Sequence, residues 1–249
     1  RVNASSAIQN KGVSKEWYLD TPKHYYLELI KESIEKYGTV LLYVQYLILY
    51  DFQWRLRDDL SRILTEEEQE GYEDCLKEML NYMDDDLICH LDKMYAEYKI
   101  FALSLKYGRD IRKELKYRKG SLYFHHIKIY SFQAKSLFSV DVLEVKEGML
   151  HLSGRIWCPF ADETEFYFQN EKGEQFTICS KPAGFRKAVI FGREIMRVRG
   201  FEVQLPLSGV RGYRAFASYQ GRFPQRLFMR AGKFSHLSQE VSELYYHDG

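Results

Sequence analysis

The sequence predicts an α+β protein: an N-terminal α-helical domain of about four helices over residues 15–115, then an antiparallel β-sandwich over residues 120–235. The main observation is the spacing of apolar residues, which changes from every third or fourth position to every second position. Helices bury a stripe with the first spacing, and strands bury one face with the second. We expect residues 1–14 to be the remnant of an upstream core and residues 236–249 to be a tail or linker.

The charge changes sign between the same two parts. Residues 1–110 carry 14 Lys and Arg against 21 Asp and Glu, a net charge of −7, whereas residues 111–249 carry 22 against 14, a net charge of +8. Two interpretations are open. The two parts attract each other, or the basic part faces an anionic polymer or a membrane surface.

The first predicted helix begins at Thr21-Pro22, because a capping hydroxyl followed by proline is a common helix start. Leu27, Ile30 and Ile34 then form one apolar stripe. Gly38 is the expected stop, because glycine adopts the left-handed conformation without strain.

Further helices follow. Residues 39–64 form a second helical stretch, nearly all apolar at its start, with a kink or a turn expected near Asp51. Thr65-Glu66-Glu67-Glu68 is a capping box, in which the threonine and the third glutamate satisfy each other's backbone N–H groups. The last predicted helix runs from about residue 84 to residue 107 and ends at Gly108.

Beyond residue 120, short runs of alternating apolar and polar residues are separated by turns that contain glycine. Glu147-Gly148 and Asn170-Glu171-Lys172-Gly173 are the turns of two expected hairpins. The expected strands are residues 139–145, 149–156, 165–169, 175–179, 201–207, 213–219 and 226–229. Such a series of short strands is typical of an antiparallel sandwich of immunoglobulin-like architecture.

Two clusters have the residue types of metal sites. Asp84, Asp85 and Asp86 precede an apolar helical run, and we interpret them as a helix cap rather than as ligands of a divalent cation. His125 and His126 are adjacent in a predicted strand, so their side chains should point to opposite faces of a sheet. The sequence therefore predicts no metal site. It also contains neither a glycine-rich phosphate loop nor a serine nucleophile elbow, so no local motif indicates a cofactor or a catalytic residue.

A basic stretch with interspersed aromatic residues contains Arg186, Lys187, Arg193 and Arg197, with Arg199 close behind. Such cations attract phosphate-bearing polymers, so these four side chains are candidate ligands for an anionic glycan. The competing interpretation is a solvated loop. No recognition helix or stacking signature accompanies the charge, and nucleic acid is not an expected partner.

Trp54 and Arg55 end the most distinctive short segment, Tyr50-Asp51-Phe52-Gln53-Trp54-Arg55. They are candidate ligand-binding residues, because an indole can stack on a sugar and a guanidinium can hydrogen-bond a phosphate. The structural alternative makes Trp54 a core anchor and pairs Arg55 with an acid such as Asp58 or Asp59. We favour the structural alternative.

The four cysteines show no Cys-x-x-Cys spacing, and no secretory signal precedes them, so buried free thiols are expected rather than disulfides. No apolar run approaches the roughly 18–20 residues that span a bilayer. The expected location is cytoplasmic, with peripheral binding at the inner face of the membrane as an alternative.

Several segments resemble a known family. Arg1-Val-Asn-Ala-Ser-Ser-Ala-Ile resembles the tail of the nucleotide-sugar-binding core in bacterial family 2 glycosyltransferases. Gly38-Thr-Val-Leu-Leu-Tyr-Val-Gln, the segment from Tyr50 to Arg55 and the aspartate cluster resemble the C-terminal regions of members that make capsule or teichoic-acid-like polymers. This likeness covers about residues 1–110, and the β-rich part resembles immunoglobulin-like accessory domains appended to enzymes of surface-polymer synthesis.

The resemblance implies a piece of a longer polypeptide without its catalytic core. The family's donor-binding strands, its Asp-x-Asp metal motif and its acidic base belong upstream of Arg1. Gln53-Trp54-Arg55 departs from the Gln-x-x-Arg-Trp motif of processive members. No catalytic residue is therefore carried over to this chain.

The expected function is that of a non-catalytic C-terminal accessory region in bacterial cell-surface glycan synthesis, which positions the acceptor or mediates assembly. The expected partners are the upstream catalytic domain, an anionic glycan acceptor and further copies of the chain as a homo-oligomer. The alternatives are a free-standing module that binds an anionic glycan and a purely structural oligomerisation unit.

Overall fold

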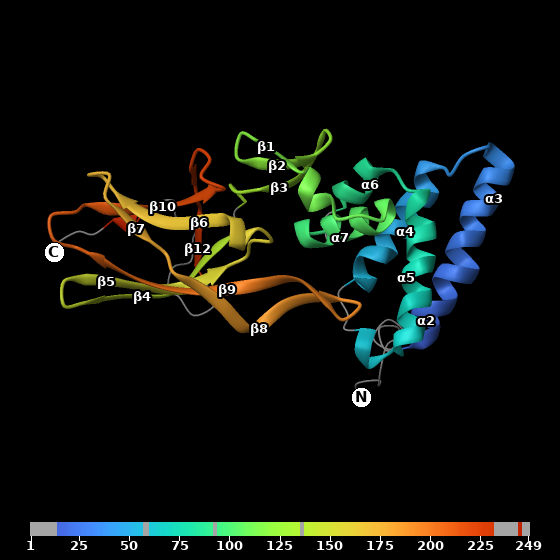
Figure 1. Ribbon diagram of the computed structural model, residues 1–249, viewed down its shortest axis with the longest axis horizontal. Helices are drawn as coiled ribbons and strands as arrows, with labels where there is room; N and C mark the ends of the chain where they lie inside the picture. Colours follow the sequence, from blue (N-terminus) through green and yellow to red (C-terminus); the bar gives the residue numbers. More distant parts are fainter. Residues whose placement is uncertain (1–13, 57–59, 92–93, 135–136, 232–243, 246–249) are drawn as a thin grey trace, which may run out of the picture. The chain divides into compact units, whose positions relative to one another are not determined.

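The computed structural model describes residues 14–56, 60–91, 94–134, 137–231 and 244–245, without the side chains of residues 182–187, 231 and 244–245. The chain forms two compact units. The helical unit comprises Arg1–Lys116, Tyr123–Ile129 and Ala188–Ile195, and the sheet unit comprises Tyr117–Leu122, Tyr130–Lys187 and Met196–Gly249. The α+β class is confirmed: helices come first along the chain, and antiparallel and mixed sheets follow (Figure 1).

The helical unit is built from short and medium helices (Figure 1). They are α2 (Lys15–Asp20), the π-helical turn η1 (Thr21–Tyr26), α3 (Leu27–Tyr37), α4 (Leu42–Arg55), α5 (Glu66–Asn81), α6 (Asp85–His90) and α7 (Ala96–Tyr107). Short 3₁₀ turns are η2 (Leu60–Arg62) and η3 (Ile111–Glu114). None of the helices in the described residues combines the length and the apolar character needed to cross a bilayer.

Three predicted helix boundaries are confirmed. The Thr65 hydroxyl accepts a hydrogen bond from the N–H of Glu68 at 3.3 Å, and the Glu68 carboxylate accepts one from the N–H of Thr65 at 2.8 Å. Gly38 and Gly108 end α3 and α7 with φ angles of 74° and 64°. This left-handed conformation is open to glycine at little cost.

Three predicted helices differ from those observed. The stretch expected over residues 39–64 is helical from Leu42 to Arg55, and Asp51 lies inside that helix rather than at a turn that divides it. The first predicted helix begins at Lys15, because the Ser14 hydroxyl caps it by accepting from the N–H of Trp17. Pro22 therefore lies inside a longer helical run, near the start of η1, where its missing N–H is tolerated. The helix expected over residues 84–107 is divided into α6 and α7, because Leu91 leaves the helical conformation with a ψ angle of 130°.

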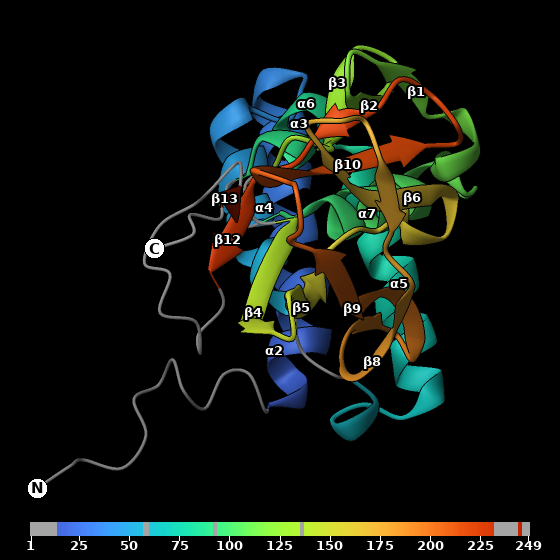
Figure 2. The same cartoon turned by 90° about the vertical axis from the view of Figure 1, so that its left-hand side faces the viewer.

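The described strands form three sheets. One has the order β1-β2-β3 (Lys116–Arg118, Ser121–Phe124 and Ile127–Ser131). Another has the order β11-β10-β6-β7 (Gln225–Arg226, Gly212–Tyr219, Thr164–Asn170 and Gln175–Thr177), with β13 (Leu244–Tyr245) paired to β10. The third has the order β12-β4-β5-β9-β8 (Met229–Ala231, Phe138–Lys146, Met149–Ile156, Arg193–Pro206 and Ser180–Ile190), and its strands β4, β5 and β9 lie side by side in Figure 2.

The predicted β4–β5 hairpin is confirmed. Its two turn residues, Glu147 and Gly148, have φ angles of 53° and 74°, as a type I′ turn requires at both central positions. Lys146 pairs with Met149 directly across the turn. The hairpin register therefore follows from the local turn chemistry.

Gly154 in β5 marks a close approach in the sheet unit. A Cβ atom at this position would overlap the carbonyl oxygen of Ser139 in β4 and the ring of Phe201 in β9. The ring of Phe201 stacks on Phe138 at 4.5 Å between centroids, and Phe138 packs against Phe168 of β6 at 5.9 Å. These rings join side chains of both five-stranded sheets in one core.

A hairpin tip from the β-rich part belongs to the helical unit. Phe191, in the turn between β8 and β9, has its ring centroid 5.6 Å from that of Tyr72 in α5 and 5.7 Å from that of Phe101 in α7. The Arg193 guanidinium makes two 3.0 Å contacts with the Glu73 carboxylate. Phe191 has a φ angle of 50°, which is rare for a bulky residue, so the packing of its ring stabilises a strained turn.

The variants Gly71→Ala and Gly154→Ala make the same chemical change with opposite expected results. Gly71 lies in α5 with nothing within 4 Å of an added Cβ atom, so alanine should raise the free energy of unfolding by about 0.5–1 kcal/mol. At Gly154 the added methyl must push β4 away, so the variant should lower the free energy of unfolding by about 3 kcal/mol. Urea unfolding followed by circular dichroism measures both. Equal effects of the two variants would contradict the close approach at Gly154.

Candidate interaction surface

Helix α4 reverses the usual distribution of polar and apolar side chains. Gln45, Gln53 and Arg55 are buried, whereas Tyr43 is 74% exposed and Tyr50 is 52% exposed. Buried polar groups and exposed apolar groups are the informative departures from ordinary burial. Because α4 shows both, it is the candidate functional element of the helical unit.

The exposed apolar side chains share one side of the helix. An α-helix turns by about 100° per residue, which places the five side chains within an arc of about 100°. We call them the α4 aromatic face: Tyr43, Tyr46, Leu47, Tyr50 and Trp54. The rings of Tyr46 and Tyr50 lie 6.1 Å apart, and exposed Leu42 extends the face at the start of the helix.

Buried polar side chains hold the start of α4. The Gln45 side chain donates from Nε2 to the carbonyl of Val40 at 3.1 Å, and its Oε1 accepts from the N–H of Asp84 at 2.7 Å. The Ser33 hydroxyl accepts from the N–H of Leu41 at 3.0 Å. These contacts tie the first turn of α4 to α3 and to the cap of α6.

Arg55 holds the other end of α4. Its side chain is 1% exposed, and its Nε donates to the Asp51 carboxylate at 2.5 Å. Nη1 donates to the carbonyl oxygen of Trp17, and Nη2 donates to the hydroxyl of Tyr26 at 3.3 Å. The guanidinium carbon lies 4.3 Å from the centre of the Trp17 ring, which adds a cation–π contact. Each nitrogen of the guanidinium therefore has a partner.

Two tyrosines surround this buried cation. Burial raises the pKa of Tyr26 and of Tyr72 above the usual value near 10, and the Arg55 guanidinium acts in the opposite direction on both. Tyr26 donates its hydroxyl hydrogen to Asp51. The hydroxyl of Tyr72 is buried and has no hydrogen bond of ordinary geometry within the described residues. Both phenols are therefore neutral up to strongly alkaline pH.

The α4 aromatic face offers rings and hydroxyl groups but no net charge. Between Leu42 and Arg55 the only charged residues are Asp51 and Arg55, which pair with each other. A ligand that binds through charge finds no free partner on this helix. Exposed patches of this kind mark surfaces that bind another apolar surface.

The predicted pair Trp54 and Arg55 is divided between two sides of α4. Trp54 is 38% exposed on the aromatic face, so the core-anchor interpretation favoured from the sequence was wrong. One step along a helix rotates a side chain by about 100°, which is why its neighbour Arg55 points inward. Arg55 pairs with Asp51, one turn earlier, and the expected partners Asp58 and Asp59 lie outside the described residues. A ligand-binding role for Trp54 and Arg55 stays a prediction.

The predicted basic cluster is only partly described. The side chains of Arg186 and Lys187 lie outside the described ones. Arg193 belongs to the helical unit, where it pairs with Glu73, and Arg197 is an exposed residue of the sheet unit. A shared ligand-binding role for these four residues stays a prediction.

The aspartate cluster lies at the start of a helix, as expected, but the Asp84 side chain makes no capping hydrogen bond there. Asp84 stands at the N-cap of α6. Asp85 accepts hydrogen bonds at 2.6 Å from the ammonium of Lys106 and from the hydroxyl of Tyr107, and this bond raises the pKa of Tyr107 to about 12. Its carboxylate is therefore taken up by structural contacts.

The two histidines lie in a turn, which corrects the expectation of strand residues. His125 and His126 connect β2 to β3, and the φ angle of 52° at His125 is turn geometry. His126 Nε2 lies 3.1 Å from the carboxylate of Asp86. Across the part of the chain that the structure describes, no three metal-ligating side chains come together.

All four cysteines are free, and two of them are buried. Burial raises the pKa of Cys89 to about 12 and that of Cys158 to about 11. The thiolate is the reactive form of cysteine, so neither residue is a nucleophile at neutral pH.

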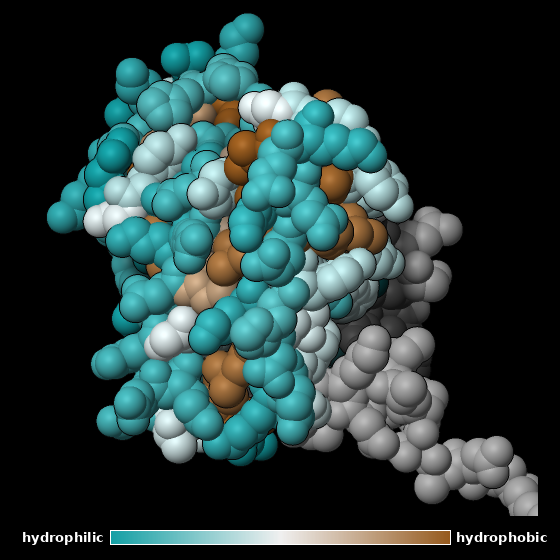
Figure 3. Space-filling model, turned by 90° about the vertical axis from the view of Figure 1, so that its right-hand side faces the viewer, coloured by the Kyte–Doolittle hydropathy of each residue, from teal (hydrophilic) through white to brown (hydrophobic). Residues whose placement is uncertain are grey.

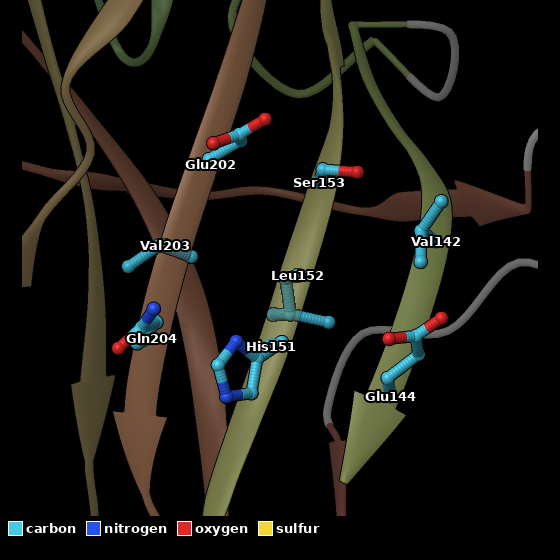
Figure 4. A pocket seen from close by; sticks show the side chains of 8 residues that line it. All are labelled: Val142, Glu144, His151, Leu152, Ser153, Glu202, Val203 and Gln204. Carbon is cyan, nitrogen blue, oxygen red and sulfur yellow. The ribbon is translucent and has the colours of Figure 1, made fainter. Parts of the chain in front are cut away.

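Two shallow grooves compete with the α4 aromatic face. One crosses β4, β5 and β9 on the side where Glu144, His151 and Gln204 pair in a row, next to Ser153 and Glu202 (Figure 4). The polar side chains of Glu144, Glu202 and Gln204 are exposed. Such a surface is usual for the solvent side of an antiparallel sheet.

The other groove lies beside α3. It is lined by Leu27, Ile30 and Ile34, with Glu28 and Lys31 among the charged residues around them. Figure 3, which looks at this side, shows small apolar patches bordered by hydrophilic side chains. Charged side chains interrupt the apolar surface of this groove more than they interrupt the α4 aromatic face.

The sequence contained a signal for the α4 aromatic face that was missed. Tyr43, Tyr50 and Trp54 follow one another at steps of seven and four residues, which is a helical stripe. The opposite side of the same helix is also apolar, at Ile48 and Phe52. With two apolar sides, the spacing alone does not tell which of them is buried.

Tyr72→Phe should change how stability depends on pH. At neutral pH the loss of a hydroxyl that makes no hydrogen bond of ordinary geometry should change the free energy of unfolding by less than about 1 kcal/mol. The folded pKa of Tyr72 is raised, so its contribution is fully present below about pH 10 and is lost as the pH rises further. Urea unfolding between about pH 9 and pH 11 should show a shallower fall for the variant than for the wild type. Tyr25→Phe, at an exposed ring, is the control, and equal slopes for all three proteins would contradict the prediction.

Asp51→Ala should lower the free energy of unfolding by about 3 kcal/mol, because it leaves the buried Arg55 guanidinium without its carboxylate. The double variant Asp51→Ala/Arg55→Met should recover part of this loss, since it removes the uncompensated charge and keeps most of the packing. Chemical denaturation of the wild type, the single variant and the double variant measures both effects. A double variant that is less stable than the single one would show that the cation itself stabilises the fold.

Comparison with known proteins shows that this chain is similar to one part of a longer protein. No protein-family model matches it. Over 260 aligned positions it is 24% identical to the minor teichoic acid biosynthesis protein GgaB of Bacillus subtilis (strain 168). The alignment covers 98% of this chain but 28% of GgaB, so the chain spans less than a third of the length of that relative. The chain is a distant homologue of one region of a teichoic acid biosynthesis protein.

Proposed function

We propose that this chain is a non-catalytic accessory region of a family 2 glycosyltransferase of bacterial cell-surface glycan synthesis, acting on the cytoplasmic side, and that the α4 aromatic face is its assembly surface. The observation that carries the proposal is the reversed burial of α4. Its polar side chains Gln45, Gln53 and Arg55 point inward and its rings point outward. An apolar face on a helix that a buried guanidinium anchors from the other side is suited to cover a second protein surface.

The similarity to GgaB supports the proposed role in bacterial cell-surface glycan synthesis, which we call the pathway part of the proposal. Nearly the whole chain aligns within a protein of minor teichoic acid biosynthesis, and most of that relative's length lies outside the alignment. A catalytic domain upstream in the same longer polypeptide would be tethered close to the accessory region. We therefore propose that catalytic domain as one partner of the chain.

Assembly is better supported than direct binding of an anionic glycan acceptor. A phosphate-bearing polymer is held mainly by cations. Arg55 and Arg193, two of the predicted cations, already pair with Asp51 and Glu73. A role of Arg197, Arg186 and Lys187 in holding the acceptor remains a separate proposal.

We also propose that the sheet unit has the immunoglobulin-like architecture expected from its strands. The strand orders β4-β5-β9-β8 and β11-β10-β6-β7 support it, because they correspond to the A-B-E-D and G-F-C-C′ orders of such domains. Tyr213, near the start of β10, donates to the carbonyl of Pro206 at 2.5 Å, like the corner tyrosine of immunoglobulin domains. A crystal structure in which β4 and β6 belong to the same sheet would overturn this assignment.

The test of the proposed function is made in the organism that produces the protein. Deleting the gene should lower the amount of a cell-surface glycan, and the wild-type gene should restore it. The variant Tyr43→Glu/Tyr50→Glu should fail to restore it at equal protein level, because two charges on the α4 aromatic face oppose burial against a partner. Chemical analysis of purified cell walls measures the glycan.

The control variant is Tyr25→Glu/Tyr37→Glu, which makes the same change at two rings that are each 52% exposed and lie off α4. It should restore the glycan fully. A deletion that leaves every wall glycan unchanged would remove the pathway part of the proposal. Turnover of a nucleotide sugar by the purified 249-residue chain would show that the region is catalytic.

A further inference from the structure

We propose that the α4 aromatic face binds the same face of a second copy of this chain, which forms a symmetric dimer. This inference rests on the proposed function, because it names the partner of the assembly surface. The face occupies one side of a helix of 14 residues, which is about 21 Å long. It is therefore a continuous strip rather than a set of isolated rings.

The charge of the face favours a copy of itself. In a two-fold contact each residue meets the same surface on the other copy, so a face with unpaired charges of one sign would repel itself. The two charges of α4 belong to Asp51 and Arg55, which neutralise each other. The strip of rings can therefore approach its own copy without bringing like charges together.

The area of the face suits a weak dimer. A fully buried aromatic side chain contributes about 150–250 Å², and these side chains are about half exposed, so the face and Leu42 would lose about 500–600 Å² in each copy. The resulting total of about 1,000–1,200 Å² lies at the lower end of specific interfaces. Interfaces of this size are typical of weak, transient complexes, so we expect a reversible dimer.

An antiparallel arrangement uses the whole strip. With the two-fold axis near the middle of the helix, Tyr43 at one end meets Trp54 of the second copy at the other. Leu47 and Tyr50 then lie close to the axis and meet the central residues of the second copy. Aromatic residues grouped at the centre of a contact supply most of the energy in protein interfaces.

Two other occupants fit the face less well. A sugar polymer can stack on such rings, but ligand sites are concave, whereas the α4 aromatic face is the convex outer side of a single helix. A lipid surface binds helices that carry exposed basic residues beside the apolar ones. The one basic residue of α4, Arg55, is buried.

The test is sedimentation velocity of the purified chain at concentrations from about 1 μM to about 200 μM, a range suited to a weak, reversible complex. The wild type should change from monomer to dimer. Tyr50→Glu should raise the dissociation constant at least about tenfold, because it places two carboxylates near the axis. Tyr25→Glu, at a ring with the same 52% exposure on η1, should leave the dissociation constant unchanged. Circular dichroism confirms that each variant is folded, and Tyr43→Glu is the second variant if Tyr50→Glu fails to fold.

A charge-swap experiment tests the symmetry of the contact. Tyr50→Glu and Tyr50→Lys should each be monomeric alone, and an equimolar mixture of the two should form a mixed dimer. A merely structural role of Tyr50 would not produce this rescue. A mixture that stays monomeric would overturn the antiparallel contact through Tyr50.

Three results would overturn the dimer itself. These are a wild type that stays monomeric at 200 μM, equal effects of Tyr25→Glu and Tyr50→Glu, and a wild type that binds phosphatidylcholine vesicles through Tyr50 without dimerising. If the chain is monomeric while glycan synthesis in cells still requires Tyr43 and Tyr50, the dimer fails and the proposed assembly function stands. If neither the association nor the glycan responds to these variants, both fail.

Discussion

The burial of the Arg55 guanidinium is the constraint on which the helical unit depends. A buried cation must keep its hydrogen bonds, and those of Arg55 run to the carboxylate of Asp51, the carbonyl of Trp17 and the hydroxyl of Tyr26. These partners come from α2, η1 and α4 and are far apart in the sequence. The rotation of α4 is therefore set by a polar contact on its inner side, and its rings face outward as a consequence.

This arrangement separates two roles that one helix usually combines. Ile48, Leu49 and Phe52 supply the apolar burial of α4, while Gln45 and Arg55 determine its position at each end. The outer side keeps large apolar side chains exposed to solvent. Exposed apolar surface lowers solubility, which is why we assign it a binding role.

Local chemistry made part of the fold predictable. The capping box at Thr65, the stops at Gly38 and Gly108 and the turn at Glu147 and Gly148 each depend on neighbouring residues, and each is confirmed. What the sequence could not reveal depends on distant contacts. Such contacts set the division of the last helix at Leu91 and the inward position of Arg55. The local spacing of apolar residues therefore does not predict either feature.

The candidate surface shows the same limit. The stretch from Val40 to Tyr50 is apolar on both sides, and no period in it distinguishes core from surface. Trp54 looked like an anchor because large rings are usually buried, yet its neighbour Arg55 takes the inner side. The burial of the polar residue Arg55, rather than the apolar spacing, therefore indicates which side of α4 faces the core.

The path of the chain between the two units has a consequence for how such a region can be inherited. The helical unit includes Phe191, which is contributed from within the β-rich part and packs on Tyr72 and Phe101. A gene segment cut after residue 116 would encode helices that lack this ring. Recombination that exchanges one unit without the other would therefore remove an aromatic ring from the core of the helical unit.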